Sequence, residues 1–339
     1  RIRADLARFA PRGTLTHGRL RWEGSAEAPT TYVAAAEFAQ LGLIAQDAFP
    51  GATGLNGRFE ATNEGGELKI ASSNATLDLP RILPSPIALD SLRGLVKWER
   101  RDGETKVRVE QLEIVNADVA GEVAGTYRTL ADGPGEIELV ARASRGDARQ
   151  IHRYLPRSID DATREWLRTA LVGGTAADTR LKIAGNLADF PFANGKGGKL
   201  TFSTKASAVM LAYANGWPPI DAIDGEVRID GARLTVVAAR GRVHGVEIGR
   251  TRVEIPDLAA KVPQLRIDGE AAGPVAGFLR FVNASPLAAR IGPITGDTEA
   301  SGGGRLALNI GLPLGRTEDT KVAGEFTLSD AQLRFAGAP

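Results

Sequence analysis

The residues best suited to acid–base or metal chemistry are three histidines, because imidazole titrates near neutral pH and is a common metal ligand. His17 lies in a predicted turn flanked by glycine, and His152 falls on a short predicted helix. His244 follows Val243 in a predicted strand. None of the three has a second ligand at the spacing of a metal site. We therefore expect all three to be structural or exposed.

Two other patterns resemble catalytic motifs but have simpler explanations. Asp221 and Asp224 are spaced like paired acids, yet they lie in what reads as a loop entering a strand, where aspartates support turns. The glycine-rich segment 195–200 lacks the Ser or Thr that follows the lysine of a phosphate-binding loop, and a strand is expected after it instead of a helix. The sequence contains neither a Gly-x-Ser-x-Gly motif nor a cysteine. We predict no catalytic site, no metal site and no cofactor.

Charge and composition exclude several classes of protein. Lysine and arginine total 42 against 41 aspartates and glutamates, and both signs are interspersed, so a nucleic-acid surface is not expected. The absence of cysteine excludes a disulfide framework and fits an oxidising compartment. No apolar run approaches the roughly 18 residues of a membrane-spanning helix. The first residues read like the interior of a longer protein, so we expect a fragment whose anchor lies elsewhere.

The elements that would position any site are short runs in which apolar and polar residues alternate, bounded by Gly, Asp or Asn. A period of two is typical of a strand with one apolar and one hydrated face. Roughly fifteen to twenty such runs predict a mainly β chain that forms one long antiparallel sheet.

Local irregularities refine this prediction. Between Val109 and Ile114 the apolar phase slips by one residue, which predicts a β-bulge or a tight turn near Glu110 or Gln111. The pairs Asn56-Gly57, Asn215-Gly216 and Asp230-Gly231 predict turns, and Gly302-Gly303-Gly304 reads as a flexible lead-in to a strand.

Helical patterns are few. One helix is predicted to open at Ser158 and to stop at Gly173, with Trp166 and Leu171 on its apolar face. A second begins at Pro274, and a shorter one spans 147–154. The chain is therefore divided into an N-terminal part of a β-groove (1–145), a helical insertion (146–175), a central part of the groove (176–272), a helical segment (273–291) and C-terminal strands (292–339).

An open sheet of this size must curl, because twisted sheets rarely exceed about ten strands without curling or splitting. With one apolar face, it predicts a curled, gutter-like groove. The aromatic share is only 6%, so the groove would be aliphatic, which suits hydrocarbon chains. The predicted lining residues are Leu68, Ile70, Val107, Val109, Leu181, Ile183, Leu200, Phe202, Val227, Ile229, Leu234, Val236, Val253, Ile255, Leu306, Leu308 and Ile310. Trp166, Phe278 and Leu279 are predicted to plug or flank the groove from the helices.

Several ordered segments resemble the YhdP branch of the AsmA-like proteins. Between residues 145 and 315 they are Tyr154-Leu155-Pro156, Trp166-Leu167, Gly173-Gly174, Asp189-Phe190-Pro191-Phe192, Tyr213, Trp217-Pro218, Ile255-Pro256-Asp257-Leu258 and Ser285-Pro286-Leu287. Upstream, Pro11-Arg12-Gly13, Trp22, Leu77-Asp78-Leu79-Pro80 and Trp98 look similar. A sister branch such as TamB or AsmA proper stays open.

This resemblance implies a bridge-like lipid transfer protein of the Gram-negative envelope. Such a protein is anchored in the inner membrane, spans the periplasm and conducts phospholipid along an elongated β-groove toward the outer membrane. The implied partners are phospholipids, the inner membrane through an anchor outside this sequence, and outer-membrane or periplasmic proteins. The family implies no catalytic residue.

Two other functions remain open. The chain could be a periplasmic scaffold that aids outer-membrane assembly, with its apolar face filled by its own helices. It could also be an enzyme or adhesin built on a β-solenoid, although the sequence shows no coil repeat of constant length.

Overall fold

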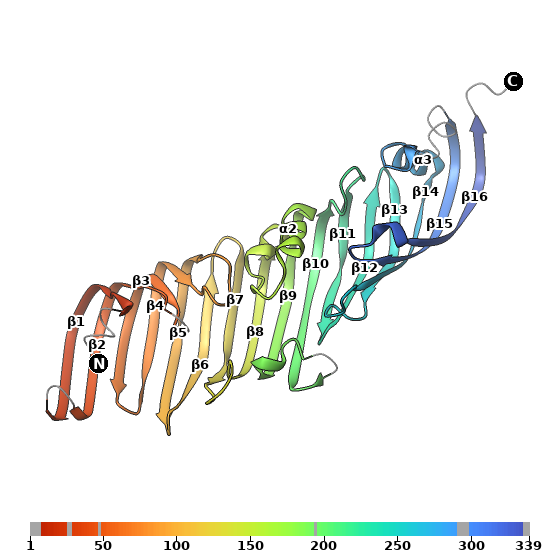
Figure 1. Ribbon diagram of the computed structural model, residues 1–339. Coiled ribbons are helices and arrows are strands. Elements are labelled where there is room, and N and C mark those ends of the chain that lie inside the picture. Colours follow the sequence, from red (N-terminus) through yellow and green to blue (C-terminus); the bar gives the residue numbers. More distant parts are fainter. Residues whose placement is uncertain (1–7, 26–28, 47–48, 193–194, 290–297, 335–339) are drawn as a thin grey trace. The chain divides into compact units, whose positions relative to one another are not determined.

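The computed structural model describes residues 8–25, 29–46, 49–192, 195–289 and 298–334 (Figure 1). Residues 290–297, where two of the predicted segments meet, lie outside this range. The chain divides into two compact units. The N-terminal unit holds Arg1–Gly146, Gln150–Arg164 and Asp178–Leu200, and the C-terminal unit holds Asp147–Arg149, Glu165–Ala177 and Thr201–Pro339. The finer division into five segments stays a prediction.

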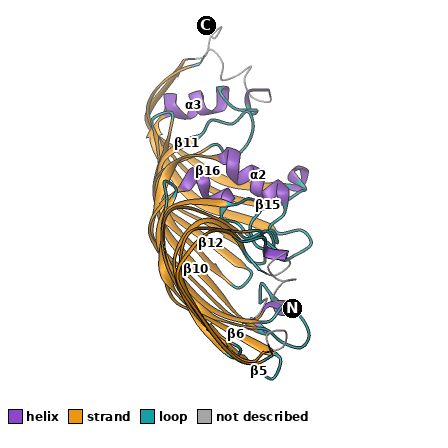
Figure 2. Cartoon of the chain, turned by 90° about the vertical axis from the view of Figure 1, so that its left-hand side faces the viewer, coloured by secondary structure: helices purple, strands orange, loops and turns teal. Residues whose placement is uncertain are grey.

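Sixteen antiparallel strands follow one another in chain order in a single sheet that is not closed into a barrel, with β1 and β16 at its ends. The strands are 10 to 16 residues long. They are bent into arcs, and the helices lie on the concave side (Figure 2). The predicted mainly β class, with one antiparallel sheet and few short helices, is confirmed.

In the N-terminal unit each strand pairs with the next one along the chain. These strands are β1 (Arg12–Gly24), β2 (Pro29–Leu43), β3 (Gly51–Thr62), β4 (Gly65–Asp78), β5 (Ile87–Arg101), β6 (Glu104–Val115), β7 (Val119–Arg128) and β8 (Glu136–Asp147). The 3₁₀ helices η1 (Ala148–Arg153) and η2 (Leu187–Asp189) lie in connections, and β9 (Leu171–Asn186) has residues in both units.

The C-terminal unit repeats this meander. Its strands are β10 (Gly198–Leu211), β11 (Ile220–Asp230), β12 (Arg233–Val243), β13 (Val246–Ile255), β14 (Gln264–Pro274), β15 (Glu299–Pro313) and β16 (Lys321–Arg334), and η4 (Thr317–Asp319) precedes β16. The helix α3 (Val275–Asn283) follows Pro274, as predicted.

The first predicted helix has different ends from those expected. α2 (Asp161–Ala170) begins after Asp160, whose carboxylate accepts hydrogen bonds from the backbone N–H and the hydroxyl of Thr163 at 2.8 and 2.7 Å. The N-cap is therefore Asp160 and not Ser158. Leu171 and Gly173 belong to β9, because the Ala212 N–H already binds the carbonyl of Ala170 (2.8 Å) and strand pairing starts there. The short helix predicted over 147–154 is the 3₁₀ helix η1.

The turn predictions have mixed outcomes. Asp230-Gly231 starts a hairpin as predicted, since Asp230 pairs with Arg233 across a two-residue loop. Asn215-Gly216 lies in a turn between β10 and β11, as predicted.

Two glycine motifs predicted as turn or lead-in lie inside strands. Asn56-Gly57 is in β3, where a Cβ on residue 57 would come 2.1 Å from the Lys69 carbonyl oxygen. Gly302-Gly303-Gly304 is in β15, where a Cβ on residue 304 would come 2.6 Å from the Phe326 ring. Glycine is needed at both positions because groups from the neighbouring strand pack closely against the backbone. The local sequence does not reveal such a contact, so it could not be predicted.

The predicted bulge is present in β6. Leu95 pairs with Gln111 and Val96 with Val109, so Glu110 is left without a partner in the register. The extra residue lets Val109 and Leu112, three positions apart, face the same side of the sheet.

Bulges of this kind recur in other strands. Gln40, Asn74 and Ala208 have positive φ values of 53°, 56° and 51°. The Asn56 Oδ1 atom accepts a hydrogen bond from the Gln40 N–H (3.0 Å), and the Asp224 Oδ1 atom accepts one from the Ala208 N–H (2.8 Å). Side chains on the next strand thus satisfy backbone donors that the sheet ladder leaves free.

The largest buried cluster lies in the N-terminal unit. Its members are Phe38, Ala52, Leu55, Ile70, Ala75, Ile87, Leu89 and Leu92. Phe59, Leu68, Leu83 and Tyr154 are partly buried against it. This cluster fills only part of the apolar face, because other apolar side chains of the same strands stay half-exposed.

We expect Leu92→Ala to lower the free energy of unfolding by about 3 kcal/mol, because Leu92 is 2% exposed and its truncation leaves a cavity. Leu139→Ala is the matched control, since Leu139 is half-exposed on the same apolar face, and it should cost about 1 kcal/mol. Urea denaturation of the two variants tests this. Equal losses would contradict the assignment of Leu92 to a closed core.

Candidate functional site

A continuous apolar row runs across the strands of the C-terminal unit from β11 to β16 and meets Thr204 on β10. The row, read from the pairing register, is Thr204, Val227, Val236, Val253, Ile267, Ile310 and Val322. Cross-strand partners project from the same face of a sheet. Six aliphatic side chains on consecutive strands therefore form one strip.

The neighbouring row has the opposite character. It consists of Ser203, Arg228, Thr235, Glu254, Arg266, Gly311 and Lys321. Because successive residues of a strand point to opposite faces, this polar row lies on the other side of the sheet. The sheet of this unit is thus apolar on one face and charged on the other.

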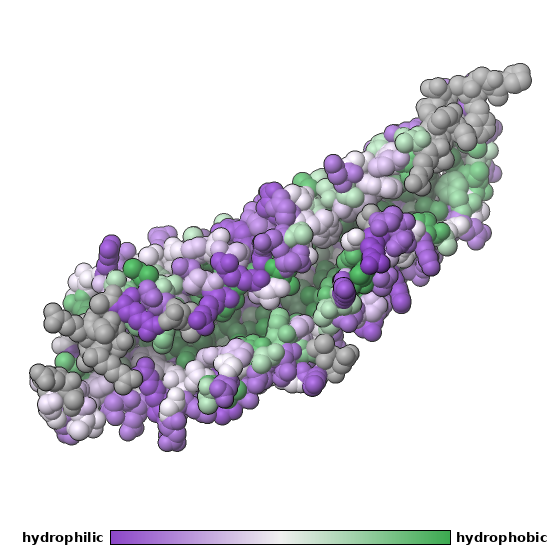
Figure 3. All heavy atoms as spheres, in the orientation of Figure 1, coloured by the Kyte–Doolittle hydropathy of each residue, from purple (hydrophilic) through white to green (hydrophobic). Residues whose placement is uncertain are grey.

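The N-terminal unit is built in the same way. Its apolar row is Ala36, Phe59, Leu68, Val96, Val109, Gly125 and Leu139. The adjacent row is Ala35, Glu60, Glu67, Lys97, Arg108, Thr126 and Glu138. In each unit apolar atoms line the floor of a hollow, with polar atoms along its edges (Figure 3).

The structure brings most of the predicted lining residues together on these faces. Val227, Val236, Val253 and Ile310 share the row described above. The row of Phe202, Ile229, Leu234 and Ile255 lies beside it on the same face, and Leu306 and Leu308 alternate with Ile310 along β15.

The remaining predicted lining residues lie in the N-terminal unit. Leu68, Val107 and Val109 are half-buried, whereas Ile70 belongs to the closed core. Leu181, Ile183 and Leu200 are half-buried too, and exposed Arg180 and Lys182 alternate with the first two. That any of these residues contacts a ligand stays a prediction.

Part of the apolar face in the N-terminal unit is closed by a cover segment, residues 150–160. Tyr154 packs on the buried cluster, and its hydroxyl lies 2.9 Å from Asn116 Nδ2 and 3.1 Å from Asp118 Oδ2. Burial raises the pKa of Tyr154. Arg153 forms an ion pair with Asp118 at 2.5 Å, which fixes the segment to the loop between β6 and β7.

Two arginines hold the shape of the cover segment. Arg164 donates to the carbonyl oxygens of His152, Leu155, Pro156 and Ile159 at 2.9 to 3.2 Å. Arg157 reaches the carbonyls of the loop between β4 and β5, at 3.2 and 3.3 Å. A guanidinium can serve several carbonyls at once because it carries five N–H donors in a fixed plane.

In the C-terminal unit α3 closes a comparable strip. Val246 and Val275 are 2% and 3% exposed, and Gly277 lets the helix approach Val246, since a Cβ there would lie 2.8 Å from its methyl group. Arg280 donates to the carbonyl of His244 (2.9 Å). Phe278, a predicted plug, packs edge-on against Phe326 with the ring centroids 4.9 Å apart.

Aromatic contacts tie α2, the connection 212–219 and α3 together within the C-terminal unit. The Trp166 Nε1–H donates to the carbonyl of Tyr213 (3.0 Å), and the Trp217 ring makes tilted contacts with the rings of Tyr213 and Phe281, at centroid distances of 6.0 and 5.9 Å. Burial raises the pKa of Tyr213 to about 12. Trp166 is 46% exposed, and Leu279 is half-buried on α3.

The candidate catalytic residues take structural positions. His17 was predicted in a turn but lies inside β1, where it has a positive φ and its Nδ1 atom lies 3.0 Å from a carboxylate oxygen of Glu37. His152 lies on η1. His244 was predicted within a strand but lies in the turn between β12 and β13, because the β12–β13 pairing closes at Val243 and Val246.

Asp221 and Asp224 were predicted in a loop, but both lie in β11, where each forms an ion pair with an arginine of β12. The Ala208 N–H and then Arg240 lower the pKa of Asp224. Within the described residues no group of three or more His, Asp or Glu could hold a metal ion.

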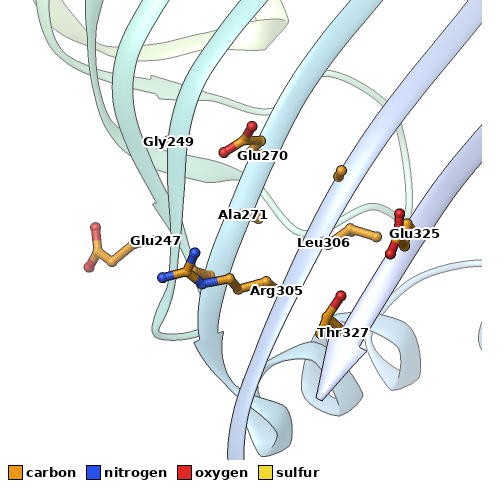
Figure 4. Close-up of a pocket in the computed structure, with 10 residues that line it drawn as sticks. Glu247, Gly249, Glu270, Ala271, Arg305, Leu306, Glu325 and Thr327 are labelled. Atoms are coloured by element: carbon orange, nitrogen blue, oxygen red, sulfur yellow. The ribbon is translucent and has the colours of Figure 1, made fainter. Parts of the chain in front are cut away.

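A depression of about 490 Å³ over β13–β16 is lined by several charged side chains (Figure 4). Glu247, Glu270 and Glu325 surround it together with Arg305 and Thr327. The register places all five out of phase with Leu306 and Leu308, on the polar face. It therefore belongs to the hydrated side of the sheet.

A family model described as "YhdP protein" matches residues 1–339. The chain belongs to the YhdP family. The curated proteins and the solved structures gave no match. In the described part of this YhdP-family chain, no helix has both the length and the apolarity needed to cross a membrane.

The segments on which the YhdP resemblance rested now have structural roles. Tyr154 and Pro156 belong to the cover segment, and Trp166, Tyr213 and Trp217 form the aromatic contacts next to α3. These five residues thus lie in the cover segment and in the contacts beside α3, whereas the motif residue Trp98 lies half-buried in β5. The open strip carries no motif and is predicted only by the alternation of aliphatic and polar residues.

A single cysteine introduced into this cysteine-free chain should report which strip is open. We expect Leu308→Cys to react readily with an apolar fluorescent maleimide and to give blue-shifted emission, because Leu308 is half-exposed on the apolar face. Val246→Cys, under α3, should react at least about tenfold more slowly, because access requires local opening. Equal labelling rates would contradict the closure by α3.

Proposed function

We propose that this YhdP-family chain shields phospholipid acyl chains on its apolar face and conducts them across the periplasm, between the inner and outer membranes. The observation that carries the proposal is the largely half-exposed apolar row on consecutive strands of each unit. YhdP proteins are cell-envelope proteins, and membership of the family suggests bridge-like lipid transfer.

The cost of exposing acyl chains to water explains why an apolar surface is enough to carry a lipid. Moving an acyl chain through water costs about 0.8 kcal/mol for each exposed methylene. A phospholipid with roughly thirty methylenes therefore meets a barrier of more than about 20 kcal/mol. An apolar strip removes most of this barrier while the headgroup stays hydrated, and no bond is made or broken. The proposed function is therefore non-catalytic and needs no cofactor.

The proposed partners are phospholipids, the inner membrane and envelope proteins at the ends of the path. A passive groove has no direction of its own, so a lipid gradient or these partners would supply it. The second candidate function is a structural periplasmic scaffold for outer-membrane assembly. The observation that favours it is that the cover segment and α3 already close part of the apolar face.

We expect Leu308→Asp to lower transfer of a fluorescent phospholipid between donor and acceptor vesicles at least about tenfold, because an unpaired carboxylate among acyl chains is costly to desolvate. Asn309→Asp is the matched control, since Asn309 is exposed on the opposite face of the same strand, and it should leave transfer unchanged. Circular dichroism verifies that both variants fold.

Photo-crosslinking separates the two candidate functions. A photoreactive residue at Val236 or Leu308 should capture phospholipid, identified by mass spectrometry, if the apolar face carries lipid. Capture of protein alone would favour the scaffold, and unchanged transfer by Leu308→Asp would contradict conduction along this face.

A further inference from the structure

The apolar face of the N-terminal unit changes its chemistry along β5. Leu92, Val96, Trp98 and Arg100 occupy alternate positions of a regular register with β4 and so share one face. Leu92 is buried in the core, Val96 and Trp98 are half-buried, and Arg100 is exposed. The side chains on this face of β5 therefore follow a fixed order. The buried Leu92 comes first, then an aliphatic and an aromatic side chain, and the cationic Arg100 comes last.

The rows that hold Trp98 and Arg100 continue onto the neighbouring strands. Trp98 pairs with Val107, which pairs with Tyr127. Arg100 pairs with Thr105, whose backbone N–H binds Thr129 Oγ1 at 2.8 Å. The outermost position is thus a row of one guanidinium and two threonines, directly beyond a row that holds Trp98 and Tyr127.

The two aromatic side chains are held at the boundary between these rows. The Trp98 ring lies against the backbone of Gly66, where a Cβ would come 2.6 Å from the ring. The Tyr127 hydroxyl donates to the carbonyl of Pro134 (3.0 Å), in the loop that follows β7. Trp and Tyr combine an apolar body with a polar tip, which is why they favour the level where hydrocarbon meets water.

The length of this part of β5 also matches that of a phospholipid. From Gly94 to Arg100 the strand rises about 20 Å, which is close to one bilayer leaflet with its headgroups, about 20–22 Å. Beyond Gly94, Leu92 and the cover segment close the face, so chain ends can extend no further in that direction.

We infer that phospholipid on the N-terminal unit lies along β5–β7, with its chain ends toward Leu92, its ester region beside Trp98 and Tyr127, and its phosphate on Arg100. This inference rests on the proposed function and adds an orientation and a phosphate subsite to it. Among the described residues the guanidinium of Arg100 has no ion-pair partner, and the Arg100 backbone N–H donates to the Glu64 carbonyl (2.6 Å).

Arg100→Gln tests the phosphate subsite, with Arg101→Gln as the matched control, because Arg101 is adjacent on the strand and on the opposite face. Titration of the full chain uses two soluble probes with the same chains, dioctanoyl phosphatidylglycerol and dioctanoylglycerol. We expect Arg100→Gln to weaken binding of the phospholipid about tenfold and to leave dioctanoylglycerol unchanged, because only the first carries a phosphate. Arg101→Gln should affect neither.

The other results each have a definite meaning. Equal weakening of both probes by Arg100→Gln, or no difference from Arg101→Gln, would overturn the phosphate subsite while lipid binding stands. If the unmodified chain binds neither probe, the proposed function itself fails.

The orientation is tested by fluorescence quenching of Trp98 in a chain whose Trp22, Trp166 and Trp217 are replaced by phenylalanine. Phospholipids brominated next to the ester should quench Trp98 more strongly than those brominated near the terminal methyl. The reverse order would overturn the proposed orientation.

Discussion

The structure depends on keeping apolar side chains in phase across consecutive antiparallel strands. A slip of one residue would turn a whole strand's apolar set toward water, so bending such a sheet threatens its amphipathic character. Bulges resolve this conflict. The extra residue at Glu110, like the positive-φ residues Gln40 and Ala208, permits a bend and restores the facing, and side chains such as Asn56 satisfy the freed backbone groups.

An apolar face of this extent must also be reconciled with water. The protein closes one strip of it with its own connections, the cover segment in the N-terminal unit and α3 in the C-terminal unit, and leaves the adjoining strip half-exposed. The closed strip supplies the fully buried contacts that stabilise a folded unit. The open strip adds less stability, and an exposed apolar surface of this kind is typical of a binding site.

The charged residues of the polar face have a structural role, and no catalytic role is needed to account for them. Its acids and bases pair across strands, as Lys97 does with Glu110 and Arg240 with Asp224, at side chains that remain largely hydrated. Exposed pairs of this kind contribute little stability. Their value lies in keeping a long, two-sided sheet soluble on its outer face, where both signs of charge are interspersed.

Local patterns were enough to predict the strand period, the irregularity near Glu110, the helix at Pro274 and the amphipathic character of the sheet, because alternation and turn chemistry are local properties. Which apolar residues are closed and which are open depends on the packing of the folded chain, since Ile70 and Leu68 are alike in pattern and differ in what covers them. The tertiary structure also placed Gly57 inside a strand and brought Tyr127 of β7 into the same row as Trp98 of β5. These assignments depend on partners far away in the chain, which local sequence patterns do not encode.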